Sequence, residues 1–132
     1  MSSRTEPADP PQGAPVIRIT AMPQNTNPAG DIFGGWLMGL MDLAGASAAT
    51  RRVRGRCATV AVEAMSFISP VRVGDEVSCY AEVISTGRTS LKVRVEAWRR
   101  EQEGDHMNRV TDAVFTFVAL DQTGRPRPVP AA

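Results

Sequence analysis

One carboxylate in an otherwise uncharged, apolar run is the strongest candidate for chemistry in this chain. Asp42 is the only ionisable residue of the segment 33–46, FGGWLMGLMDLAGA. If the segment is a helix, the neighbours of Asp42 one turn away are Met, Gly and Ala residues, which can neither balance its charge nor donate a side-chain hydrogen bond. Burying an unpaired carboxylate is costly. Asp42 is therefore a candidate general base or nucleophile, and the alternative is a carboxylate that caps buried backbone groups or pairs with a distant arginine.

Two loops carry polar side chains that can hold a substrate. Asn27 and Asp31 can orient water or a substrate, and their alternatives are a turn residue and a helix N-cap, respectively. The second loop is a basic, hydroxyl-bearing turn made of Arg88, Thr89 and Ser90. Such a turn suits phosphate groups, and Arg125 and Arg127 in the tail can add further charge. Exposed arginines at turns that bind nothing are the alternative.

The elements that must position these residues follow from the apolar period. Before Gly55 we expect a short strand over 16–22, a polar loop over 23–31 and a helix over 33–52 that Asp31 caps. After Gly55 the period changes to two, which is typical of strands. The expected strands cover 58–65, 77–83, 91–97 and 110–119, with turns at 70–75 and 87–88 and a charged hairpin at 99–108.

One strand, one long helix and four further strands define an α+β fold. Short turns between consecutive strands predict an antiparallel meander. The helix is apolar nearly all round and rich in Gly and Ala, so it must be covered on several sides. We therefore expect one curved antiparallel sheet wrapped around one long central helix. Five strands cannot cover every side of a helix, so the remaining sheet edges and helix flank predict a dimer.

Most other aromatic and ionisable residues have structural interpretations. Glu63 is expected to be solvated or paired across strands, and the single histidine, His106, to be solvated in the charged hairpin. A histidine solvated in this hairpin cannot serve a His-based triad, and no Gly-x-Ser-x-Gly elbow is present. No cluster has metal-ligand spacing, so neither a metal nor another cofactor is expected. Five aromatic residues are expected to pack in the core: Phe33, Trp36, Phe67, Phe115 and Phe117.

Length and charge restrict the remaining possibilities. A chain of 132 residues makes one domain, expected over 16–123, with a disordered arm over 1–15 and a Pro-rich tail over 124–132. Fifteen Lys and Arg against 14 Asp and Glu give no global field for nucleic acid or an anionic membrane, so a local cluster must hold any anionic ligand. Cys57 and Cys79 are expected as free thiols. Without a signal peptide or an apolar span of about 20 residues, we expect a cytoplasmic protein.

Several segments carry a family resemblance. The stretch 27–38, NPAGDIFGGWLM, followed by Met41 and Asp42, resembles bacterial YciA-type acyl-CoA thioesterases of the hotdog superfamily. The segments VAVEAMSF at 60–67, VGD at 73–75, GRTSL at 87–91 and TDAVFTF at 111–117 are similar to strands and turns of the same family, in the same order. The resemblance covers about 17–130, nearly the whole folded part.

The resemblance implies a hotdog fold and hydrolysis of an acyl-CoA thioester to a free acid and CoA, in fatty acid metabolism. It also implies homodimers with active sites between subunits, usually assembled into a hexamer of three dimers. Asp42 matches the family's catalytic aspartate, with backbone N–H groups at Gly34 and Gly35 polarising the carbonyl. Phe33 and other aromatic residues can line an acyl tunnel. General-base catalysis and nucleophilic attack through a mixed anhydride both fit Asp42.

The spacing of these residues ties the site to the dimer. Asp42 lies seven or eight residues beyond the two glycines. At a rise of about 1.5 Å per residue, the distance along the helix axis from the glycines to Asp42 is about 10 to 12 Å. Asp42 must then serve a carbonyl held by the partner subunit. The alternative functions are a non-catalytic acyl-CoA-binding regulator, a scaffold with the same fold, and a thioesterase that acts on acyl-carrier protein.

Overall fold

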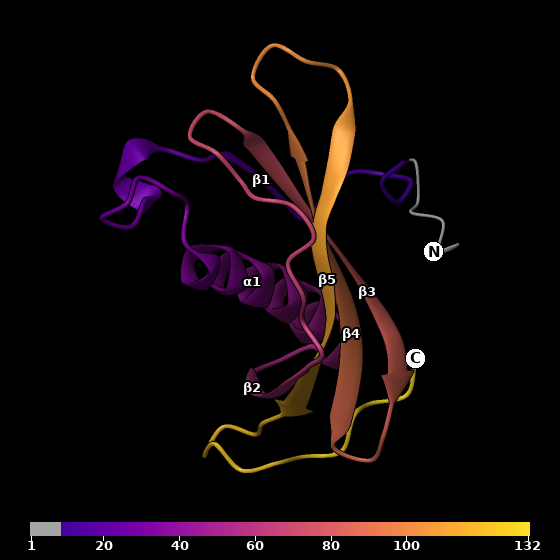
Figure 1. Ribbon diagram of the computed structural model, residues 1–132. Coiled ribbons are helices and arrows are strands. Elements are labelled where there is room, and N and C mark those ends of the chain that lie inside the picture. Colours follow the sequence, from indigo (N-terminus) through magenta and orange to yellow (C-terminus); the bar gives the residue numbers. More distant parts are fainter. Residues whose placement is uncertain (1–8) are drawn as a thin grey trace.

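The computed structural model describes residues 9–132 as one long helix held against a curled five-stranded antiparallel sheet (Figure 1). The helix α1 spans Gly34–Val53, and a 3₁₀ helix spans Pro23–Asn25. The strands are β1 (Ile17–Thr20), β2 (Cys57–Glu63), β3 (Glu76–Thr86), β4 (Ser90–Arg100) and β5 (Met107–Ala119). The expected arm over 1–15 falls partly on residues 1–8, which lie outside the described residues.

The strand order is β1-β3-β4-β5-β2, which corrects the expected meander. The second strand, β2, pairs with β5 and not with its successor β3. The connection over 64–75 is too long for a hairpin, and it begins at Ala64, whose φ of 45° turns the chain away from β2. Ile68 then donates its N–H to the carbonyl of Val110 at 2.7 Å, which fixes the connection against β5.

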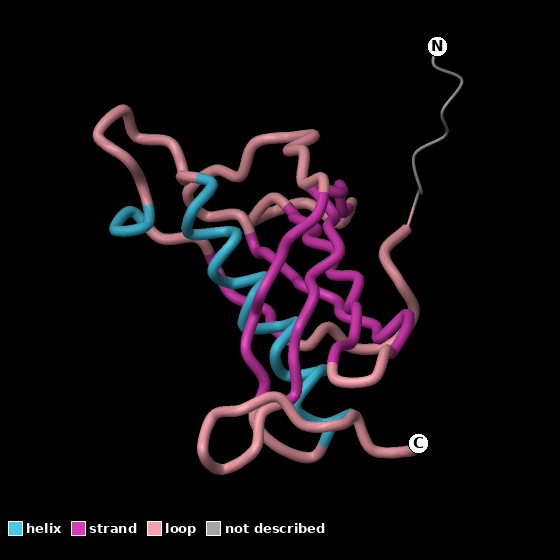
Figure 2. The backbone as a smooth tube through the Cα atoms, turned by 90° about the horizontal axis from the view of Figure 1, so that it is seen from below, coloured by secondary structure: helices cyan, strands magenta, loops and turns pink. Residues whose placement is uncertain are grey.

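The helix packs across the concave face of the sheet (Figures 1 and 2). The alternation predicted for β4 is confirmed, because Leu91, Val93, Val95 and Ala97 are all buried. Gly45 lets the helix approach this face closely. A Cβ built there would lie 3.1 Å from Val95 and 3.2 Å from Phe117, tighter than ordinary contacts. The absence of a side chain at Gly45 therefore permits close helix–sheet packing.

The two ends of α1 are held differently from expectation. Phe33 is the N-cap residue and makes no side-chain cap, so the prediction that Asp31 caps the helix is wrong. Asn27 orders the preceding loop instead, because its Oδ1 accepts the N–H groups of Ala29 at 2.9 Å and of Asp31 at 3.1 Å. At the other end, Arg127 donates from Nη2 to the carbonyl of Val53 at 2.6 Å, which satisfies a free helix carbonyl.

One flank of α1 and one edge of the sheet are uncovered. The exposed stripe of the helix follows a spacing of three and four residues and consists of Gly35, Met38, Gly39, half-buried Asp42, Leu43 and Ser47. Leu43 is 64% exposed. Val60, 57% exposed, lies on β2, the last strand of the sheet. An uncovered apolar edge beside an uncovered helix flank is the surface that the sequence predicted for a dimer.

Two expectations about individual side chains have different outcomes. Cys57 and Cys79 are free, as expected. Burial raises the pKa of the Cys79 thiol to about 12, which keeps it protonated and unreactive at neutral pH. Phe115 and Phe117 are buried, but Phe33 and Phe67 are 43% and 50% exposed, so their assignment to the core is wrong. These two rings flank the start of α1.

Candidate active site

Asp42 has one direct partner, and it comes from the sheet. The hydroxyl of Thr59 on β2 donates a hydrogen bond of 2.6 Å to Oδ1 of the aspartate. No arginine pairs with Asp42 anywhere in residues 9–132, and no backbone N–H in that range bonds to its carboxylate. The carboxylate is therefore oriented by a neutral donor and keeps an oxygen available for another group, as a base or nucleophile requires.

The start of α1 offers free N–H donors. Within the described part of the chain, the N–H groups of Gly34 and Gly35 make no hydrogen bond, whereas Trp36 donates to the carbonyl of Phe33 at 3.1 Å. Both glycines are exposed and carry no side chain over the first turn, so an oxygen can approach these donors. The positive end of the helix dipole reinforces this preference for a partly negative oxygen.

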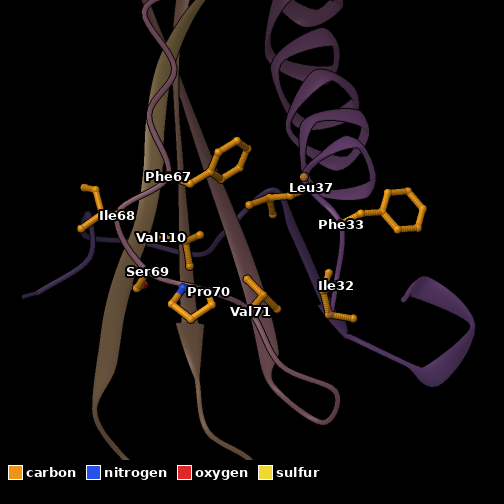
Figure 3. A pocket seen from close by; sticks show the side chains of 10 residues that line it. Ile32, Phe33, Leu37, Phe67, Ile68, Ser69, Pro70, Val71 and Val110 are labelled. Carbon is orange, nitrogen blue, oxygen red and sulfur yellow. The ribbon is translucent and has the colours of Figure 1, made fainter. Parts of the chain in front are cut away.

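An apolar pocket of about 310 Å³ opens beside these glycines (Figure 3). It lies between the start of α1 and the connection over 64–75, and its lining includes Ile32, Phe33, Gly34, Leu37, Phe67, Ile68, Ser69, Pro70, Val71 and Val110. Figure 3 shows Phe67, Leu37 and Val110 pointing toward one another, whereas the ring of Phe33 points away. No charged side chain lines the pocket. It suits an apolar ligand.

Asp42 and the glycines do not meet within one chain. The eight residues from Gly34 to Asp42 correspond to roughly 12 Å along a helix. Yet Gly35 and Asp42 both lie on the exposed stripe, where a second molecule can reach them. The structure brings Asp42 together with Thr59, and it brings Gly34 together with the apolar pocket.

The predicted phosphate-binding residues lie at the opposite end of α1. Val129 donates its N–H to the carbonyl of Arg88 at 2.8 Å, and Nη1 of Arg52 donates to the carbonyl of Pro130 at 2.7 Å, so the β3–β4 turn, the tail and the helix C-terminus meet there (Figure 1). Exposed arginines gather at this end, which we call the basic end: Arg51, Arg54, Arg56, Arg88 and Arg125. Their guanidinium groups make no hydrogen bond or ion pair within residues 9–132.

Other sequence candidates take structural positions. Glu63 pairs with Lys92 across 3.0 Å, as expected for a cross-strand pair, and His106 is exposed. The guanidinium group of Arg127 donates hydrogen bonds to the carbonyls of Val53 and Leu120. Thr89 and Ser90 are half-buried in the β3–β4 turn. Among residues 9–132, no three His, Cys, Asp or Glu side chains group into a metal site, and no helix is long and apolar enough to cross a membrane.

Thr59 and the pocket were not found from the sequence. Thr59 is 17 residues from Asp42, and nothing in the alternation of β2 distinguishes it from its neighbours. The only signal in the sequence that could have indicated Thr59 was the presence of a hydroxyl side chain on the strand that follows the helix. Phe67 was assigned to the core because it is aromatic, and only the path of the connection over 64–75 leaves its ring at the surface.

A central helix held by a curled five-stranded antiparallel sheet defines a protein of the hotdog class. The family described as "Thioesterase superfamily" matches residues 29–105, and the chain belongs to this family. The resemblance seen in the sequence is thereby confirmed.

Relatives and solved structures agree with this assignment over nearly full lengths. The acyl-CoA thioester hydrolase YciA of Escherichia coli is 46% identical over 123 residues, which are 91% of this chain and 93% of that protein. A hexameric thioesterase from Yersinia pestis is similar in structure, with a TM-score of 0.87, 48% identity and coverage of 92% of this chain and 99% of that one. A hexameric broad-specificity acyl-coenzyme A thioesterase is also similar in structure, with a TM-score of 0.86 and 47% identity. The match covers 93% of this chain and 85% of that one.

Proposed function

We propose that this protein hydrolyses acyl-CoA thioesters, with each active site shared by two subunits. The observation that carries the proposal is the placement of Asp42, which is oriented by Thr59 and lies half-buried on the same helix stripe as the free N–H group of Gly35. The names of the relatives supply the substrate class: acyl-CoA thioester hydrolase.

A two-fold axis near Met38 and Gly39 explains how the two halves of the site meet. If the stripes of two copies lie antiparallel about this axis, Gly35 of each copy lies opposite Asp42 of the other. A Cβ built on Gly39 would meet no atom within 4 Å, which leaves room for close approach of the second helix. Pairing of the uncovered β2 edges would support the same arrangement. Three such dimers would make a hexamer like those of the similar structures.

The chemistry follows from this arrangement. The thioester carbonyl oxygen lies at the N–H groups of Gly34 and Gly35, which stabilise the negative charge that develops on it. As a general base, Asp42 takes a proton from water while the water oxygen attacks the carbonyl carbon. The tetrahedral intermediate then expels the CoA sulfur, which receives that proton, and the free acid leaves. Asn27 and Asp31, in the loop before the helix, are proposed to position water or the substrate.

Nucleophilic attack by Asp42 is the other route. The carboxylate displaces the CoA thiolate and forms a mixed anhydride, which water then hydrolyses. Single-turnover hydrolysis in ¹⁸O-labelled water separates the two routes. A general base incorporates the label into the product acid in the first turnover. A nucleophile that water opens at the aspartyl carbon leaves the label on Asp42. Neither route needs a cofactor, since water is the second reactant.

The role of Thr59 gives a first prediction. Thr59→Val is expected to lower kcat roughly tenfold, because it removes a charge-assisted hydrogen bond that orients Asp42. Thr59→Ser keeps the hydroxyl and is expected to retain most activity. Steady-state kinetics on one acyl-CoA measure both variants. Equal activity of Thr59→Val and wild type would show that Asp42 needs no such orientation.

The basic end is proposed to bind the phosphates of CoA, with Arg88, Thr89, Ser90 and Arg125 as the predicted contacts. The eleven residues from Asp42 to Val53 span roughly 16 Å of helix. The pantetheine arm is about as long as four extended residues, roughly 15 Å. The chain that supplies Asp42 therefore also supplies the phosphate contacts, while its partner supplies the glycines.

This division predicts a defect confined to binding. Arg88→Gln and Arg125→Gln are expected to raise KM for acyl-CoA several-fold with little change in kcat, because the phosphate contacts are the same in ground and transition states. Both variants are expected to hydrolyse S-acyl pantetheine, which lacks the phosphates, at the wild-type rate. Arg94→Gln, in an exposed pair with Asp112, is the control. Equal KM values for wild type and both variants would contradict the assignment.

The main alternative is an acyl-CoA-binding protein without catalysis. A panel of CoA esters from acetyl to palmitoyl, followed by release of free thiol, decides between them. Binding of these esters without thiol release would favour the alternative.

A further inference from the structure

We propose that Phe67 sets the length of the acyl chain that the apolar pocket at the start of α1 accepts. This inference rests on the proposed thioesterase function and assigns one part of the substrate to a cavity within a single subunit. The occupant follows from continuity: Gly34 lines the pocket and also presents one of the free N–H groups proposed to bind the thioester carbonyl.

The lining of the pocket excludes a polar occupant. Ser69 is its only side chain with a hydroxyl, and this hydroxyl donates to the carbonyl of Arg109 at 3.2 Å. Leu37, Val71 and Val110, on the inner wall, are buried residues of the hydrophobic core. A hydrocarbon chain is the part of an acyl-CoA that gains from such a surface.

Phe67 is the aromatic wall residue that lies over the start of α1. Its ring is half exposed, and its tip lies 3.2 Å from a Cβ built on Gly34, so the absence of a side chain at Gly34 allows the ring to lie over the helix start. Its successor Ile68 is held by the backbone hydrogen bond to Val110, and the inner wall belongs to the core. Figure 3 shows the ring of Phe67 directed toward Leu37 and the helix. The size of this side chain therefore limits the depth of the pocket.

The volume gives an expected length. At about 30 Å³ for each water-sized group, a pocket of 310 Å³ accepts roughly eight to ten methylene-sized groups. Each methylene that enters it is expected to raise kcat/KM by about fourfold. The gain should stop at a break point, beyond which additional carbons remain in water.

The test measures kcat/KM for straight-chain acyl-CoA esters from two to sixteen carbons, on the full-length oligomer. Phe67→Ala is expected to move the break point by two or more carbons toward longer chains, and Phe67→Trp toward shorter chains, with acetyl-CoA hydrolysis changed only a few-fold. Val73→Ala, in the same connection, similarly exposed and outside the pocket lining, is the control and should leave the break point unchanged.

Opposite shifts in the two Phe67 variants, with unchanged thermal unfolding, support the inference. An unchanged break point in both variants overturns it and leaves the thioesterase function intact. A wild-type protein that hydrolyses no acyl-CoA overturns the proposed function itself, so the two failures are distinguishable.

Discussion

Replacing Asp42 by asparagine is expected to lower kcat for acyl-CoA hydrolysis by roughly 10²- to 10⁴-fold, the range typical for loss of a general acid–base group. The substitution keeps the size of the side chain, and the remaining amide oxygen can still accept the hydrogen bond from Thr59. What is lost is the ability to take a proton from water or to attack the thioester. Steady-state kinetics with release of free thiol measure the change.

The control for Asp42→Asn is Asp105→Asn, the same chemical change in the exposed loop between β4 and β5. It is expected to leave kcat and KM unchanged. Size-exclusion chromatography should show the same oligomeric state for both variants and wild type, and thermal unfolding should show similar midpoint temperatures. Wild-type turnover in the Asp42→Asn protein would remove this residue from the mechanism.

The difference between Asp42 and Thr59 shows what the sequence reveals about the site. Asp42 is conspicuous because local periodicity is enough to show a lone charge in an apolar helix. Its partner depends on how the strand after the helix is placed, and β2 lies at the sheet edge beside β5. The helix itself supplies no partner for Asp42, as its sequence indicates, and the partner comes from the sheet, while no opposite charge neutralises the carboxylate among residues 9–132.

The fold class was predictable, whereas the strand order was not. The long helix and four of the strands follow from their apolar periods, which depend only on local sequence. The pairing of β2 with β5 depends on the connection over 64–75, whose left-handed residue, Ala64, gives no signal in the sequence. The same limitation explains Phe67, an aromatic residue that this connection leaves half exposed.

The expected local cluster of positive charge could not be located in full from the sequence, for a related reason. The formal net charge of +1 is an average over the whole chain. The fold separates charges that are mixed along the sequence and gathers five exposed arginines at one end of α1. Among nearby acids, Asp121 accepts hydrogen bonds from the N–H of Arg125 and from Thr123, which lower the pKa of its carboxyl and fix the turn that carries Arg125.

Gly35→Ala is expected to lower activity by roughly 10²-fold, the cost of displacing a reacting group by about 1 Å, while the fold is retained. A Cβ at this position would lie 3.6 Å from the ring of Phe33, an ordinary contact, and alanine is the better helix former. The added methyl group stands where the thioester oxygen must approach the N–H groups. Gly104→Ala, whose Cβ would also make only ordinary contacts, is the matched control in a distant loop.

The decisive experiment combines the two inactive proteins, because a site shared between subunits can be rebuilt in a mixed dimer. When Asp42→Asn and Gly35→Ala chains are co-expressed, half of the randomly paired dimers are mixed. Each mixed dimer has one site with an intact Asp42 from one chain and an intact Gly35 from the other, so recovered activity is expected at roughly one quarter of wild type. A site contained within one chain would stay inactive in every combination, since each chain lacks one half of it. Activity of the purified mixed oligomer therefore tests the distance argument for Asp42 directly: recovery requires that the carboxylate act on a carbonyl held by the neighbouring subunit's helix.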